Sequence, residues 1–305
     1  MARMQNGKLS WIVAGLILSC IARVSAQQLA PRTFWPAPKG TQVAVAGYSY
    51  TFGNVLVDPS LPVSDVDSRI NTGFLAYLQT FNLMGRTANF LLEQPYSWGT
   101  TKGSLDGEHV QAEFSGFDDL GVTVAVNLLG APSINLNEFQ ELRAHPHPIL
   151  GASVKVVAPT GTYDKNKLIN TGANRWAVRP KLGCVLPLRP KWLLEVETSA
   201  WFFGDNDDYI SGKREQDPIL AAELHLVKRL QPGFWASLDG TYFWGGEQTI
   251  GGKHLSDEQS NVRVGGTIVM PFFRRHAIKV GYSDTVLTKH GNDFQQFLIT
   301  YQFLF

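Results

Sequence analysis

Hydrophobic and polar residues alternate along most of the chain, in segments separated by turn-forming residues. Alternation with a period of two indicates β-strands that have one apolar face. The pattern predicts strands near residues 42–53, 69–83, 87–98, 118–129, 149–159, 175–187, 191–203, 218–229, 234–245, 260–271, 277–288 and 294–305. These predicted strands are even in number, as in antiparallel up-and-down barrels of the outer membrane.

The last predicted strand runs to the final residue. Its apolar face consists of Phe297, Ile299, Tyr301, Phe303 and Phe305, which alternate with partly polar residues. One interpretation is the last strand of a soluble antiparallel sandwich or barrel. The other is the closing strand of an outer-membrane barrel whose apolar face contacts lipid. In the second case, we expect these five residues to be the C-terminal signal that the outer-membrane assembly machinery recognises.

The connections between the predicted strands alternate in length. Tight turns occur at Met84, Leu188, Leu230 and Phe273, whereas long polar connections include VLVDPSLPVSDVD, GTTKGSLDGEH and TGTYDKNKLINTGAN. Outer-membrane barrels have short turns on the periplasmic side and long loops on the exterior. The alternation therefore favours a transmembrane barrel over a sandwich.

One long connection lies on the short-turn side and has helical character. Asn135 precedes a run of helix formers, and Glu138 follows it at the spacing of a capping box. This pattern predicts a short periplasmic helix as an insertion near residues 133–146.

The N-terminus has the features of a secretory signal. Arg3 and Lys8 precede the apolar stretch WIVAGLILSCIA, and VSA ends at Ala26 as a small-residue cleavage site. The apolar stretch is shorter than the roughly 20 residues that a membrane-spanning helix needs. We expect residues 1–26 to be a cleaved signal peptide, residues 27–41 an N-terminal periplasmic arm that can occlude the lumen from below through Trp35 and Pro36, and residues 42–305 a barrel in the outer membrane of a Gram-negative bacterium, with lipid as a partner.

Composition narrows the function classes. Lys+Arg 27 against Asp+Glu 26 leaves a net charge of +1, so there is no basic field that would bind nucleic acid. Cys184 is the only cysteine after the predicted signal peptide, so no intrachain disulfide is expected. We expect no cofactor, and the sequence assigns no metal ligand and no catalytic residue.

In nearly every predicted strand, the charged residues fall on the face opposite the apolar residues. A charge on the lipid face would cost about 2–4 kcal/mol at mid-depth, so a barrel keeps such residues inside. The expected lumen-lining and selectivity residues are Glu93, Lys155, Arg175, Arg179, Lys181, Glu195, Glu197, Glu223, His225, Asp239, Arg263 and Lys279. They form either a polar conduit for a small solute or an ion-paired plug that fills a narrow barrel.

Several longer motifs resemble a known family. They are PRTFWPAPKGTQV, VDPSLPVSDVDSRINT, FNLMGRTANF, VNLLGAP, VKVVAPTGTYDKNKLINTGANRWAVRP, WFFGDNDDY, REQDPI, QSNVRVGGTIVMPF and RRHAIKVGYS. Together they resemble the bacterial outer-membrane transporter family of the MetA-pathway of phenol degradation, over essentially the whole mature chain. The resemblance implies an outer-membrane β-barrel and an association with aromatic-compound catabolism. It implies no residue-level mechanism.

These observations predict a channel or transporter for small molecules, with aromatic or hydrophobic compounds as candidate solutes. A barrel enzyme of the lipase or protease type is one alternative, because Ser199, Glu223 and His225 contain suitable residue types. A purely structural or adhesive barrel is the other alternative.

Overall fold

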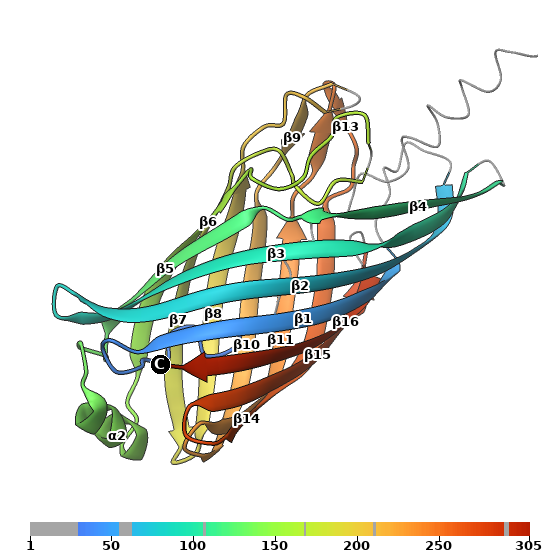
Figure 1. Ribbon diagram of the computed structural model, residues 1–305. Helices are drawn as coiled ribbons and strands as arrows, with labels where there is room; N and C mark the ends of the chain where they lie inside the picture. The colour runs from blue at the N-terminus through green and yellow to red at the C-terminus, as the bar shows by residue number, and fades with distance from the viewer. Residues whose placement is uncertain (1–29, 55–62, 106–107, 168, 210–211, 290–292) are drawn as a thin grey trace, which may run out of the picture.

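A computed structural model describes residues 30–54, 63–105, 108–167, 169–209, 212–289 and 293–305 (Figure 1). The predicted signal peptide lies outside the described residues. The barrel strands are β1 (Gln42–Asn54), β2 (Val63–Leu83), β3 (Arg86–Leu105), β4 (Glu108–Phe117), β5 (Leu120–Leu129), β6 (Ile149–Ala158), β7 (Ala177–Arg189), β8 (Trp192–Phe203), β10 (Ile219–Gln231), β11 (Phe234–Gly245), β14 (Gln259–Phe272), β15 (His276–Thr288) and β16 (Asp293–Leu304).

The sheet closes on itself through its first and last strands. β1 pairs antiparallel with β16 from Val43↔Leu304 to Asn54↔Asp293. β4 and β5 both pair with β3, so together they form one interrupted strand. The described residues therefore form a 12-stranded antiparallel barrel, which confirms the predicted fold class.

The interruption corrects one part of the sequence prediction. GTTKGSLDGEH was expected to be a long loop, but β3 continues to Leu105 and pairs with β4. These extensions carry polar residues on both faces, so they lack the one-sided apolar pattern that reveals a strand. β2 is also longer than predicted, because it begins at Val63.

The two ends of the barrel differ, as the connection lengths predicted. Figure 1 shows α2 (Leu136–Ala144) and the C-terminus near one end, and β9 (Arg214–Gln216) and β13 (Lys253–His254) near the other. β9 and β13 flank β12 (Gln248–Ile250) in a small sheet within the long connections. We call the two ends the short-turn end and the long-loop end.

The predicted helix is present with its capping box. The Asn135 side chain accepts hydrogen bonds from the backbone of Asn137 and Glu138, at 2.9 and 3.1 Å. Glu138 Oε2 accepts in return from the Asn135 backbone at 2.6 Å. No helix among the described residues is long and apolar enough to cross a membrane.

The two faces of the barrel wall differ in polarity. On β8, Val196 and Phe202 point outward and are 37% and 50% exposed, whereas Glu195, Glu197 and Trp201 point inward and are buried. Other strands also present large apolar side chains on the outer surface, among them Leu75, Leu182, Leu224, Leu238, Val264, Val280, Phe297, Ile299 and Tyr301. An apolar outer surface around a charged interior is the arrangement of a transmembrane barrel.

Candidate functional site in the barrel interior

The interior of the barrel has three levels, which can be followed along single strands. The inward residues of β8, starting from the long-loop end, are Trp201, Ser199, Glu197 and Glu195, and finally Leu193. On β10 the sequence of levels is the same, from Ile219 through Glu223 and His225 to Val227. We name the levels the loop-side cavity, the charged belt and the apolar plug.

The apolar plug fills the short-turn end. Its buried members come from the N-terminal arm, from α2 and from the inner faces of the strands, and they include Phe34, Trp35, Leu142, Ile149, Val185, Leu193, Val227 and Trp235. Phe34 is 1% exposed. The arm between residues 30 and 41 therefore folds into the lumen and packs there as part of the core.

Polar and cationic contacts also hold the arm. The backbone N–H of Arg32 donates to Glu195 Oε2 at 2.5 Å. The Arg32 guanidinium lies 5.2 Å from the ring centroids of both Trp35 and Trp235, within the range of cation–π attraction. Burial lowers the pKa of Arg32 to about 10, and the nearby Glu195 opposes this shift. Arg32 therefore stays charged at neutral pH inside the barrel.

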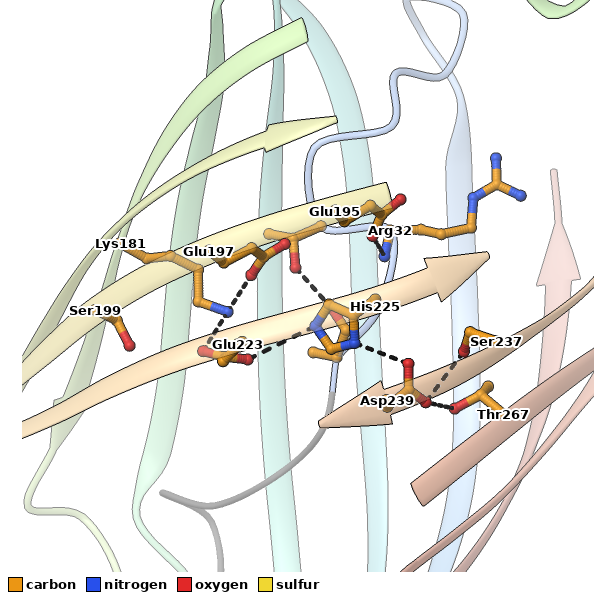
Figure 2. Close-up of polar contacts among 12 residues, drawn as sticks. Arg32, Lys181, Glu195, Glu197, Ser199, Glu223, His225, Ser237, Asp239 and Thr267 are labelled. Atoms are coloured by element: carbon orange, nitrogen blue, oxygen red, sulfur yellow. Dashed lines mark hydrogen bonds and ion pairs between the residues drawn. The ribbon is translucent and has the colours of Figure 1, made fainter. Parts of the chain in front are cut away.

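The charged belt crosses the middle of the lumen. It consists of Arg179, Lys181, Glu195, Glu197, Glu223, His225 and Asp239, which are all buried. Figure 2 shows the Lys181 ammonium between Glu197 and Glu223, forming ion pairs with both. Arg179 also forms an ion pair with Glu223. Glu197 and Glu223 are directly opposite on β8 and β10, so the two cations offset a repulsion between the carboxylates.

A second chain of contacts starts at His225. Its Nδ1 lies 2.8 Å from Asp239 Oδ1, and the two residues are directly opposite on β10 and β11. Ser237 and Thr267 donate to the other Asp239 oxygen at 3.0 and 3.1 Å. The carboxylate is thereby fixed, and it holds the imidazole in one orientation, as Figure 2 shows.

The loop-side cavity lies between the charged belt and the long-loop end and has a volume of about 150 Å³. Its apolar wall includes Ile70, Phe74, Pro95, Val157, Trp201, Phe203 and Ile219, and its polar wall includes Glu93, Asp118, Asp119, Lys155 and Arg175. Lys155 and Glu93 form an ion pair, and the Arg175 guanidinium lies 4.6 Å from the Phe203 ring centroid. The cavity therefore offers aromatic surfaces beside charged groups.

Two aspartates mark the interruption between β4 and β5 and face this cavity. Burial raises the pKa of Asp118 to about 6, although the hydroxyl of Ser97 donates to its carboxylate at 2.7 Å. Burial also raises the pKa of Asp119, against hydrogen bonds from the backbone N–H groups of Ala173 and Gly161, both at 2.8 Å. Asp119 thus ties the connection after β6 to the barrel wall.

The residues expected to line the lumen are distributed over these levels. Each is buried or half-buried: Glu93, Lys155 and Arg175 line the cavity, whereas Arg179, Lys181, Glu195, Glu197, Glu223, His225 and Asp239 form the belt. Arg263 lies apart from the belt, with its guanidinium 3.7 Å from the Phe294 ring centroid. Lys279 is half-buried on β15.

Some interior residues lie outside the regular alternation and were not predicted. Arg32 belongs to the arm, Arg214 to β9 and Asp118 to the interruption, so no strand pattern marks them. Arg229 could have been found. It shares the inward parity of His225 and Val227, and its guanidinium lies 5.3 Å from the Trp35 ring centroid.

The closed barrel, its apolar outer surface and its charged interior define the protein as an outer-membrane β-barrel. The family described as "Putative MetA-pathway of phenol degradation" matches residues 34–296. The chain belongs to this family, as its motifs indicated.

Solved structures share the fold. An outer membrane channel from Pseudomonas putida F1 is similar with a TM-score of 0.74 and 24% identity, over 91% of this chain and 100% of that chain. The transport unit of the autotransporter AIDA-I from Escherichia coli is similar with a TM-score of 0.50 and 9% identity, over 100% of both chains. Among curated proteins, no match is found.

Proposed function

We propose that the protein is a channel that admits small amphipathic molecules, aromatic compounds among them, through the outer membrane. The loop-side cavity carries this proposal, because aromatic and aliphatic side chains form one wall and charged groups form the other. A ring with a polar substituent matches such a cavity: the ring packs on Trp201 or Phe203, and the substituent bonds to Arg175 or Lys155. The family description, which refers to phenol degradation, is consistent with this class of solute.

The route from the cavity to the periplasm passes the charged belt and the apolar plug. Both levels are closely packed, since Glu223, His225, Leu193 and Val227 are at most 1% exposed. Passage of a solute therefore requires the N-terminal arm to move away from its contacts. The conduit and plug interpretations are then two states of one channel, with the arm bound or displaced.

Solute flux across a defined bilayer tests this proposal. Liposomes that contain the purified protein should take up phenol-sized aromatic acids faster than empty liposomes. Arg179→Gln should shift the ion selectivity toward cations, because a positive charge leaves the belt. Lys165→Gln, in an exposed ion pair with Asp208, is the matched control and should leave both readouts unchanged. Uptake equal to that of empty liposomes would contradict the channel function.

The contacts of the candidate catalytic residues argue for transport over hydrolysis. The Ser199 hydroxyl accepts hydrogen bonds from Arg179 Nε and Nη2, at 3.0 and 2.9 Å. The imidazole of His225 is bonded to Asp239 instead. Within the described residues, Ser199 therefore has a cation as its neighbour and lacks the basic partner that activates a nucleophile. Esterase or protease turnover by the purified barrel would favour the enzyme alternative.

The C-terminal strand is a candidate binding segment for the outer-membrane assembly machinery. Phe297, Ile299 and Tyr301 are 42–50% exposed on the outer face of β16, which pairs with β1 to close the barrel. We propose that this strand, together with Phe303 and Phe305, is recognised by the assembly machinery before closure. Phe305→Ser should reduce the amount of folded barrel in the outer membrane, whereas Phe273→Ser in an exposed turn should not.

If the purified protein shows neither solute flux nor enzymatic turnover, a structural or adhesive role remains as its function.

A further inference from the structure

The charged belt contains a cluster of three side chains whose arrangement the ion pairs of the belt do not explain. One potential ligand atom from each of Glu197, Glu223 and His225 lies within 4.8 Å of the other two. Their side chains are at most 2% exposed, so bulk water does not hydrate their polar atoms. Two of their polar atoms, Glu197 Oε1 and His225 Nε2, have no hydrogen-bond partner. Buried polar atoms without hydrogen-bond partners destabilise the folded protein, and a bound ligand would supply the missing partners.

The contacts of Lys181 leave one oxygen of each carboxylate without that cation. Lys181 bonds to Glu197 Oε2 and to Glu223 Oε1, so Glu197 Oε1 and Glu223 Oε2 remain. Glu223 Oε2 lies 3.9 Å from His225 Nε2, which is too far for a hydrogen bond. Two ligands of one tetrahedral zinc ion are separated by about 3.4 Å, so a small contraction of this pair would accommodate the ion.

The backbone places the three side chains on one surface. Glu223 and His225 are two residues apart on β10, so both point inward, and Glu197 is directly opposite Glu223 on β8. All three therefore come from rigid paired strands and not from loops. Figure 2 shows the His225 ring between Glu223 on one side and Asp239 on the other.

Asp239 provides the outer contact that metal-bound histidines use. A histidine ligand usually donates its second N–H to a carboxylate, which fixes the ring and raises its basicity. Asp239 accepts at His225 Nδ1, so the lone pair of the neutral imidazole is at Nε2, the atom without a partner. The tautomer that this contact favours is the one that binds metal.

We propose that Glu197, Glu223 and His225 bind a divalent transition-metal ion, with Zn²⁺ as the best match, inside the barrel. One imidazole and two carboxylates are ligands that Zn²⁺ accepts in protein sites. The ion occupies the space between Glu197 Oε1, Glu223 Oε2 and His225 Nε2, and Asp239 is a positioning residue. Lys181 is a competing cation that forms ion pairs with both carboxylates.

Metal binding to the purified, chelator-treated barrel tests the proposal. After addition of Zn²⁺ and removal of unbound ion, elemental analysis should give about one Zn²⁺ per barrel. Co²⁺ should replace it and give visible absorption bands of a low-coordinate nitrogen and oxygen site. A barrel that keeps no Zn²⁺ above the protein-free background would overturn the proposal, whatever the variants do.

Variants distinguish this site from surface binding. His225→Gln and Glu197→Gln should each abolish the bound Zn²⁺, and the second keeps the test decisive if the first fails to fold. Asp239→Asn should weaken binding about 10–100-fold, as loss of an outer contact does. Lys181→Met should tighten binding, because a competing positive charge is removed.

The control variant is His145→Gln, which removes a mostly exposed histidine beside Glu141 on α2. It should keep the full Zn²⁺ content and the Co²⁺ spectrum. If His145→Gln loses the metal while His225→Gln and Glu197→Gln retain it, the ion binds at the surface and the proposal is wrong.

Discussion

The ring of Phe34 lies in a socket in the barrel wall that Gly151 leaves open. A Cβ added to Gly151 would lie 2.2 Å from Cδ1 of Phe34, and one added to Gly183 would lie 2.6 Å from Cε2 of the same ring. Two glycines on the neighbouring strands β6 and β7 thus make room for one aromatic side chain of the arm. The absence of side chains at these positions is what lets the arm seat inside the lumen.

Phe34→Ala should therefore loosen the arm and open the channel. The variant removes an arm side chain that is only 1% exposed in the plug, so single-channel conductance in planar bilayers should rise several-fold. Phe273→Ala, in a turn where the ring is 85% exposed, should leave conductance unchanged. Equal conductance of Phe34→Ala and the unmodified protein would show that the arm does not control passage.

Lys181→Met should destabilise the barrel strongly. It leaves the buried carboxylates Glu197 and Glu223 facing each other with Arg179 as the remaining close cation, and breaking a buried ion pair costs about 3–5 kcal/mol. Urea unfolding in metal-free detergent solution, followed by tryptophan fluorescence, measures the loss. Adding Glu197→Gln to Lys181→Met should recover part of it.

Lys165→Met is the matched control for that measurement. Its ion pair with Asp208 is exposed on both sides, so its loss should cost about 0–1 kcal/mol. Similar losses for Lys165→Met and Lys181→Met would contradict an energetic role for the charged belt.

Ion selectivity should change with pH through Asp118. Its pKa is raised to about 6, so the carboxyl group is mostly protonated below about pH 5 and charged above about pH 7. The cavity gains a negative charge over this interval, and the preference for cations should increase as pH rises. Reversal potentials in a salt gradient measure this change, and most of it should disappear in Asp118→Asn. An unchanged pH profile in that variant would contradict the assignment.

Leu224→Arg should destabilise the protein in lipid vesicles by about 2–4 kcal/mol, because it places a charge on the lipid face near mid-depth. Leu224 is 54% exposed at the middle of β10, opposite Val196 of β8. Leu136→Arg on α2 alters a residue that is 60% exposed, and it should change stability by less than about 0.5 kcal/mol. Equal effects of the two substitutions would mean that lipid does not cover the strand.

The fold was largely predictable because lipid requires a strict pattern. Alternation, connection lengths and the Asn135–Glu138 capping box gave the strands, the ends of the barrel and the helix, and the structure confirms these predictions. The pattern failed for the β3–β4 extension, where neither face of the strands needs to be apolar. β9 and β12 were missed for the same reason, since three-residue polar strands carry no periodic signal.

The sequence pattern predicts which side chains face the interior, but it does not predict which of them contact one another. Parity along β10 predicts that Glu223 and His225 point inward. Parity alone cannot predict that Glu223 contacts Lys181 or that His225 contacts Asp239, because those contacts depend on the register between strands. The arm was expected to be able to occlude the lumen from below, but no periodic pattern indicates that the side chains of Phe34 and Arg32 pack inside it. Their socket exists only after distant strands have come together.

The position of the arm has a consequence for biogenesis. Arg32 precedes β1 in the chain, yet it bonds to Glu195, which lies 163 residues later. The residues that receive the arm lie on β6, β7, β8, β10 and β11, so the receiving surface forms only after these later strands have paired. The arm must therefore wait for strands that follow it in the chain, and the lumen has no plug until they have paired. Seating of the arm is then a late step of maturation, and the residues that plug the lumen come from the same chain that forms its wall.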